Sequence, residues 1–181
     1  ALSIENGKAS YRNRYIRTTD FGEDGPRGGI FGRARETGAK TVYKDTANTD
    51  VVCHAGSLLA LWYISGQPAR VDARTLETIG AESFGGRLPG NVSAHSKVDP
   101  DTGAFHFFDY ALYEPFYSYG IVDRDNRLTH FTRVETPGPR LPHDMAMTEN
   151  HVVLMDLPVV FTPEGLRNKV WHIHQDERLP T

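Results

Sequence analysis

Histidines are the residues of this chain that are best suited to chemistry. The 181 residues include eight histidines but a single cysteine, Cys53. One cysteine excludes an internal disulfide and any zinc site built from several cysteines. A metal would therefore be held by imidazoles and carboxylates, a ligand set that suits iron, copper, manganese or zinc. The histidines are His54, His95, His106, His130, His143, His151, His172 and His174.

Two histidines stand where a strand is expected to begin or end. His95 precedes the turn sequence at 99–103, and His143 follows a proline and opens the alternating run 145–147. Ends of strands on a rigid β scaffold present functional side chains. Because 48 residues separate the two histidines, they could share a metal only if the fold brings them together. Spacing alone leaves open the alternative that each is a polar residue beside a strand.

The other candidates have weaker support. His172 and His174 would share one face of a strand, but a solvated strand face is the favoured interpretation. His54 lies beside Gly56 in an expected hairpin, where a structural role is favoured. Cys53 lies in an apolar run and is expected to be a small core residue. The chain has no nucleophile elbow, P-loop or dinucleotide-binding fingerprint.

Short strands must position these side chains. Runs rich in β-branched and aromatic residues alternate with turns that contain Gly, Asn or Asp. No amphipathic helical period extends over three turns, and residues 72–80 and 163–167 could form single helical turns at most. Strand and turn at intervals of about 8 to 12 residues predict an all-β sandwich, barrel or propeller. The expected strands are 41–44, 51–53, 58–64, 69–71, 104–108, 118–122, 128–131 and 151–155.

The composition is that of an ordinary soluble domain. With 20 Lys and Arg against 23 Asp and Glu, it shows no basic surface for nucleic acid. The longest apolar run is far shorter than the ~20 residues of a membrane-spanning helix, and the first residues lack a signal-peptide pattern. We therefore expect a cytoplasmic location. Residues 19–40 differ, because six glycines between Phe21 and Gly38 indicate a long glycine-rich excursion rather than strands.

Five segments together resemble the carotenoid cleavage oxygenase family, which includes bacterial apocarotenoid and lignostilbene dioxygenases. They run in order over nearly the whole chain, and the last two match the family's most specific segments. The resemblance implies a seven-bladed β-propeller with a non-haem Fe(II) ion on its axis, held by four histidines from different blades. The segments are YRNRYIRT at 11–18, KDTANTDVVCHAGSLLALW at 44–62, TLETIG at 75–80, AHSKVDPDTG at 94–103 and HDMAMTENHVVLMDLP at 143–158.

The resemblance also assigns roles to individual residues. His95 matches the family's first iron ligand and His143 the second, and Thr49 matches a threonine whose side chain projects toward an open iron position. Members of the family add dioxygen across an alkene of a carotenoid, apocarotenoid or stilbene and form two carbonyl products. The implied partners are therefore dioxygen and an apolar polyene or stilbene-like small molecule.

Three residues bear on how this chain departs from the family pattern. Tyr63 stands where many members carry a glutamate that hydrogen-bonds a ligand histidine, so a metal-free propeller-like binding module is a rival interpretation. Trp62 stands where stilbene-cleaving members tend to carry a lysine, and Phe31 lies roughly where they place a tyrosine. Both aromatic side chains favour a carotenoid or apocarotenoid substrate over a stilbene, which stays the alternative.

The chain is much shorter than those of the family. It holds roughly three blades' worth of strands, so we expect a single partial propeller over 1–181 that continues beyond residue 181. The third and fourth histidines would lie in that continuation, and the fragment alone is expected to be inactive. Because carotenoids reside in lipid, a peripheral membrane contact is a further expectation. Its candidate surface is 105–108 with 113–116, although the alternation there favours burial in the core.

Overall fold

All regular secondary structure in the described part of the chain is β. The computed structural model describes residues 1–21, 44–64, 66–162 and 173–179, so most of the excursion at 19–40, residue Phe31, the turn at 163–167 and most of the strand at 41–44 lie outside it. These ranges contain no helix of the length and apolar character needed to cross a bilayer. The all-β prediction is confirmed.

The strands are β1 (Leu2–Glu5), β2 (Lys8–Tyr11), β3 (Asp50–His54), β4 (Ser57–Leu61), β5 (Ala69–Val71), β6 (Thr78–Ala81), β7 (Lys97–Val98), β8 (Phe105–Tyr110), β9 (Tyr117–Val122), β10 (Leu128–Arg133), β11 (Met145–Met147), β12 (Val152–Leu154), β13 (Val159–Phe161) and β14 (Ile173–Gln175).

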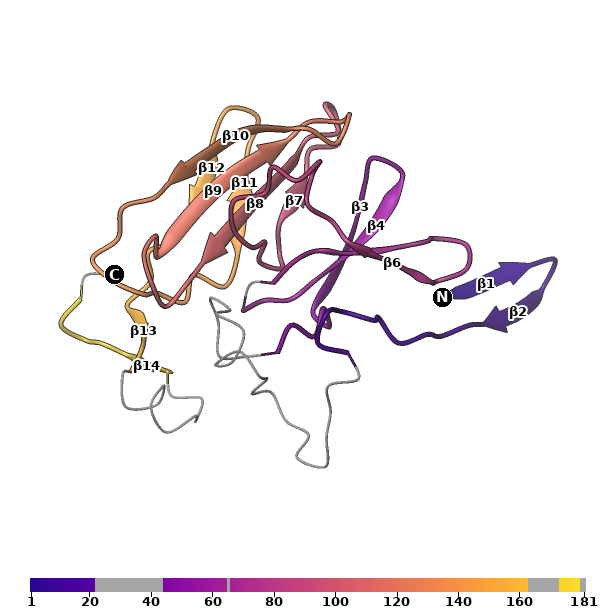
Figure 1. Cartoon of the computed structure of the whole chain (residues 1–181), viewed down its shortest axis with the longest axis horizontal. Helices are drawn as coiled ribbons and strands as arrows, with labels where there is room; N and C mark the ends of the chain where they lie inside the picture. The colour runs from indigo at the N-terminus through magenta and orange to yellow at the C-terminus, as the bar shows by residue number, and fades with distance from the viewer. Residues whose placement is uncertain (22–43, 65, 163–172, 180–181) are drawn as a thin grey trace.

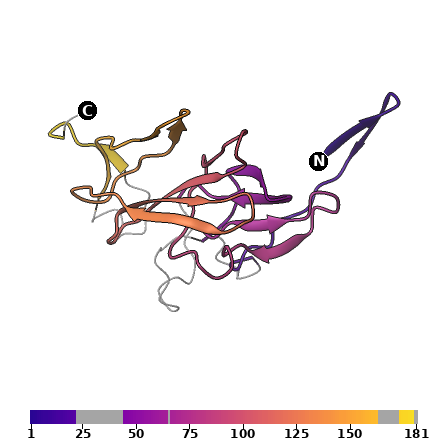
Figure 2. The same ribbon diagram turned by 90° about the horizontal axis from the view of Figure 1, so that it is seen from above.

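Two four-stranded sheets form the body of the molecule. Each is an antiparallel meander in which neighbours in sequence are neighbours in the sheet, β3-β4-β5-β6 and β7-β8-β9-β10 (Figure 1). This is the topology of a propeller blade. The pairs β1-β2, β11-β12 and β13-β14 form separate two-stranded sheets. Figure 2 shows the β1-β2 hairpin extending from the body at the end opposite to the C-terminus.

The main core lies where these two sheets meet. Leu59 and Leu61 of β4 pack with Phe105 and Phe107 of β8, and all four side chains are buried. Gly120 of β9 leaves room for this packing, because a Cβ there would lie 2.4 Å from the Phe107 ring. Phe105, Phe107 and Phe108 are fully buried, which confirms that 105–108 belongs to the core rather than to an exposed surface. For 113–116 the favoured burial was wrong, because Tyr113 is 64% exposed.

The strand alternation of β3 corrects the prediction for Cys53. Successive side chains on a strand point to opposite faces, and β3 turns Val52 and His54 inward. Cys53 is consequently exposed, so its placement in the core was wrong. His54 is buried against Phe105, with 5.5 Å between ring centres, and burial lowers the pKa of its imidazole. A structural role for His54 agrees with this position.

Two further segments differ from expectation. A single turn does form after Asp72, whose carboxylate accepts the amide hydrogens of Arg74 and Thr75 at 2.9 and 2.7 Å. Strand β6 then occupies Thr78–Ala81 and overlaps the end of 72–80, where single helical turns at most were expected. Near the N-terminus, the hairpin β1-β2 was not predicted. Both segments are short and partly polar, so strand pairing rather than side-chain propensity stabilises them.

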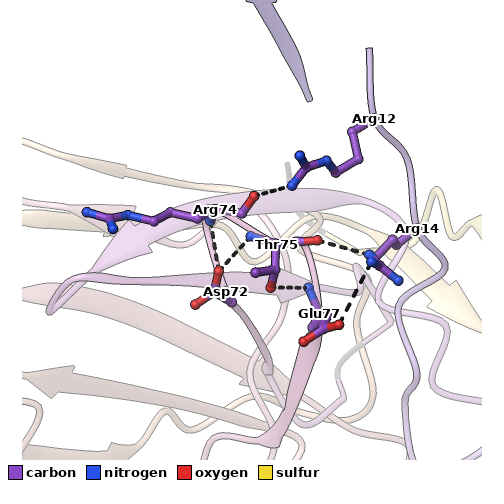
Figure 3. A network of polar contacts seen from close by, with 6 residues as sticks. All are labelled: Arg12, Arg14, Asp72, Arg74, Thr75 and Glu77. Carbon is purple, nitrogen blue, oxygen red and sulfur yellow. Dashed lines mark hydrogen bonds and ion pairs between the residues drawn. The ribbon is translucent and has the colours of Figure 1, made fainter. Parts of the chain in front are cut away.

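Arginines fasten the N-terminal segment to the turn between β5 and β6 (Figure 3). The Arg12 guanidinium donates to the carbonyl oxygen of Arg74 at 2.7 Å, and Arg14 donates to that of Thr75 at 2.9 Å. Arg14 also lies 3.8 Å from the Glu77 carboxylate in an exposed ion pair. Backbone acceptors therefore hold residues 12–14 against this sheet.

Candidate metal centre

The fold brings His95 and His143 together. His95 lies two residues before β7, and His143 lies two residues before β11. Their ring centres stand 5.0 Å apart, with an angle of 41° between the ring planes. His95 is half-buried and His143 is exposed. Two histidines that are 48 positions apart in the sequence thus form one imidazole pair.

Both histidines adopt a backbone conformation that side chains other than glycine rarely take. Each has a φ of +65°. Such left-handed residues cost about 1–3 kcal/mol each and persist only where the surroundings hold them. For His95, the backbone N–H donates to the Asp50 carboxylate at 3.2 Å. For His143, the next amide, that of Asp144, donates to the carbonyl of Pro142 at 2.8 Å. A long-range hydrogen bond to Asp50 therefore supports His95, and a local one between Asp144 and Pro142 supports the turn at His143.

The imidazole pair fits two corners of a metal site. Metal–nitrogen bonds to imidazole are about 2.1 Å long, so two rings on one ion have their centres roughly 5 Å apart. The described residues include no group of three or more His, Cys, Asp or Glu side chains that could hold a metal. An ion held by this imidazole pair would therefore need further ligands from outside the described residues.

Thr49 is linked to this pair only indirectly, through the backbone of Tyr63. The Thr49 hydroxyl accepts the backbone N–H of Tyr63 at 3.3 Å and donates to the Asn48 side-chain oxygen at 3.2 Å. Its own amide donates to the carbonyl of Leu61 at 3.0 Å. These bonds fix the side chain of Thr49 at the end of the β3-β4 pair.

Tyr63 provides the direct contact with a histidine. Its ring meets the ring of His143 edge-on, with 5.6 Å between centres and 61° between planes. Its carbonyl oxygen accepts hydrogen bonds from the Ser93 hydroxyl, at 2.9 Å, and from the Tyr110 hydroxyl. Burial raises the pKa of Tyr110, so that hydroxyl stays a donor. The backbone of Tyr63 is therefore held rigidly beside His143.

Trp62 belongs to the core. It is 4% exposed, and it packs in a small cluster with Ile64 and Leu112. Its carbonyl accepts the amide of Ala94 at 3.0 Å, which places the segment before His95 next to β4. Thr49, Tyr63, His95 and His143 are thus brought together, Trp62 lies in the adjacent core, and Phe31 is outside the described residues.

Sequence reasoning missed three charged residues at the site. Besides Asp50, these are Lys97 and Asp144, whose Nζ and Oδ1 atoms lie 2.8 Å apart. Burial raises the pKa of the Asp144 carboxyl, but hydrogen bonds from Lys97 and the Met145 amide outweigh it and hold the pKa below its usual value. For Lys97 and Asp144 the only signal was a place one or two positions after a histidine, which does not reveal that they meet. Asp50 lies 45 positions before His95, and no sequence signal pointed to it.

A cavity opens one residue away from Tyr63. It has a volume of about 260 Å³ and is lined mainly by apolar side chains. Ile64 and Leu112 line it together with Tyr110, whose hydroxyl contacts the backbone of Tyr63. Arg133 also lines it. An apolar small molecule suits such a cavity.

Comparisons with known proteins agree with one another. The family model described as retinal pigment epithelial membrane protein matches residues 1–181. Carotenoid 9,10(9',10')-cleavage dioxygenase 1 of Pisum sativum is 33% identical over 93% of this chain and 36% of its own length. The crystal structure of Pseudomonas brassicacearum lignostilbene dioxygenase is 32% identical and has a TM-score of 0.82 over 99% of this chain and 39% of that chain.

A second similar structure is that of a metal-substituted protein. Cobalt-substituted Synechocystis apocarotenoid oxygenase is 26% identical, with a TM-score of 0.55 over 81% of this chain and 31% of that chain. The present chain therefore spans about a third of the length of these proteins, between 31% and 39%.

Proposed function

Because the chain belongs to the carotenoid cleavage oxygenase family, whose model is named after the retinal pigment epithelial membrane protein, we propose that the protein is a dioxygenase that cleaves a carbon–carbon double bond. The observation that carries this proposal is the imidazole pair of His95 and His143, 5.0 Å apart. The chain supplies this half of the site, and by itself it is expected to be inactive.

The metal that we propose for the site is Fe(II), with His95 and His143 among its ligands. When bound, a ferrous ion with open coordination positions supplies the electrons and the binding position that dioxygen needs. A donor set of neutral imidazoles suits this ion. The cobalt-substituted relative supports a metal site in proteins of this fold.

Thr49 and Tyr63 would shape the surroundings of the site. The Thr49 hydroxyl is occupied by Asn48 and the Tyr63 amide, so its methyl group is the part left to limit what approaches. The ring of Tyr63 limits the rotation of His143 by packing against its edge. Tyr63 thus orients a ligand by contact, where a glutamate would do so by charge.

The substrate that we favour is a carotenoid or apocarotenoid. The cavity beside Ile64 is largely apolar, and the buried Trp62 offers no cation to a phenol. We place Phe31 among the substrate-contacting residues as well. A stilbene-like substrate is the second candidate, because the likeness to the lignostilbene dioxygenase covers 99% of this chain with a TM-score of 0.82. Product analysis of the full-length protein with a β-apocarotenal and a hydroxystilbene separates the two.

Iron content tests the proposal. Full-length protein purified with Fe(II) should bind iron, and His95→Ala or His143→Ala should abolish most of that binding and the cleavage activity. Protein that is folded but binds no iron would instead favour the metal-free binding module.

We place the protein in the cytoplasm, with a peripheral membrane contact as the route to a substrate dissolved in lipid.

A further inference from the structure

One ion pair joins the two segments that carry the histidines. Lys97 is the first residue of β7 and lies two positions after His95, whereas Asp144 directly follows His143. The Lys97 ammonium donates to the Asp144 carboxylate at 2.8 Å. The charged partners meet beside the imidazole pair because β7 lies against β11.

Backbone hydrogen bonds between strands do not join the two segments that carry the histidines. Strand β7 is an edge strand of the sheet β7-β8-β9-β10, and β11 pairs with β12 in a separate sheet. The described strands include no ladder between β7 and β11. No strand ladder therefore joins the two segments that carry the histidines, and the Lys97–Asp144 ion pair is a direct side-chain contact between them.

The same carboxylate also shapes the turn at His143. Asp144 Oδ1, the atom that Lys97 contacts, accepts the Met145 amide at 2.7 Å. His143 keeps a left-handed φ of +65° immediately before it. A residue in that conformation persists where its neighbours over-determine it. Asp144 thus couples the backbone that carries His143 to the strand that follows His95.

We propose that the Lys97–Asp144 ion pair is a positioning device that sets His143 against His95 at the distance needed to share one metal ion. This rests on the proposed function, in which the two histidines are ligands. Lys97 and Asp144 act through the histidines and are positioning residues rather than catalytic ones. Partners outside the first ligand shell typically change metal affinity about 10- to 100-fold when they are lost.

A positioning role and a purely structural role of the Lys97–Asp144 pair predict different results, because only a structural role would lower the stability of the metal-free protein. The side chains are 35% and 44% exposed, and ion pairs with that degree of exposure contribute little to global stability. Loss of the pair should therefore weaken metal binding strongly while it leaves the unfolding of the metal-free protein nearly unchanged.

Cobalt(II) titration of the full-length protein tests this, because Co(II) reports both its affinity and its coordination geometry through visible absorption. Lys97→Met keeps the length of the side chain without its charge, and Asp144→Asn keeps an acceptor for the Met145 amide. Each should weaken cobalt binding about 10- to 100-fold and shift the absorption band. The melting temperature of the metal-free protein should change by no more than about 3 °C. Lys97→Arg should restore binding to within about threefold.

Arg178→Met is the matched control. It removes an equally close ion pair, 2.7 Å from Arg178 to Asp176, next to a different sheet, and it should leave cobalt affinity unchanged. If Lys97→Met bound cobalt as tightly as the parent, the inference would be overturned while the metal site stood. A drop of more than about 10 °C in melting temperature for both variants would show a structural role and overturn it as well. A parent protein that bound no cobalt would overturn both the metal site and this inference.

Discussion

The ring of Tyr63 stands edge-on against the ring of His143, with 5.6 Å between their centres. This contact relates a residue two positions after β4, in the sheet β3-β4-β5-β6, to a histidine two positions before β11, which belongs to the two-stranded sheet β11-β12. The backbone of Tyr63 is fixed by the hydroxyls of Ser93 and Tyr110, so the ring has a rigid support. The orientation of His143 is thus tied to the first sheet.

Removing that ring should loosen His143. Tyr63→Ala in the full-length protein is expected to weaken metal binding about 10-fold or more, because the imidazole loses the edge contact that limits its rotation. Tyr63→Phe keeps the ring and should bind metal within about twofold of the parent. Metal titration followed by elemental analysis measures both. Equal losses in the two variants would show that the hydroxyl, rather than the ring contact, matters.

Asp50 should matter for the conformation of His95. Its carboxylate accepts the His95 amide at 3.2 Å and the Val51 amide at 2.8 Å. Asp50→Ala leaves His95, with its left-handed backbone, without this acceptor. The change should lower the free energy of unfolding by about 1–2 kcal/mol, and it should also weaken metal binding. Asp50→Asn keeps one acceptor oxygen and should lose less of each. Chemical denaturation and metal titration test the pair, and an Ala variant indistinguishable from Asn would contradict the expectation.

Asp45 should make stability depend on pH. Burial raises the pKa of its carboxyl to about 6, against hydrogen bonds from the Ala47 and Gln67 amides that lower it. The folded pKa exceeds the unfolded value of 3.8, so the folded protein holds the proton more tightly. The protonated Asp45 carboxyl therefore contributes to the free energy of unfolding. This contribution is fully present below pH ~4, and it is lost as the pH rises through ~6, by up to about 3 kcal/mol. Denaturation at pH 4 to 7 should show this decrease, which Asp45→Asn should remove.

Gly120 should not tolerate a side chain. A Cβ there would come within 2.4 Å of the Phe107 ring, which is fully buried and cannot turn aside. Gly120→Ala is therefore expected to destabilise the fold by about 1–3 kcal/mol. Gly138→Ala is the control, because an added Cβ there meets nothing within 4 Å and should change stability by less than about 0.5 kcal/mol. Thermal unfolding of both variants decides the point.

Local sequence patterns predicted the strands that carry their own signal. The runs 69–71 and 118–122 lie in β5 and β9, because β-branched and aromatic residues suit a half-buried pleated surface. The same reasoning missed β6, and it placed Cys53 in the core although the side chain points outward. Which face of an edge strand is buried depends on the neighbouring sheet, and a short run contains no record of that neighbour.

By itself the sequence determined the all-β class, the family resemblance and the candidates His95, His143, Thr49 and Tyr63, because these follow from local composition and motif. Only the tertiary structure decided that the two imidazoles meet at 5.0 Å and that Asp50 and Lys97 support them. Those contacts join residues 45 and 47 positions apart, from Asp50 to His95 and from Lys97 to Asp144. Such pairs arise from the register and packing of separate sheets, which are set by long-range burial and not by any local pattern.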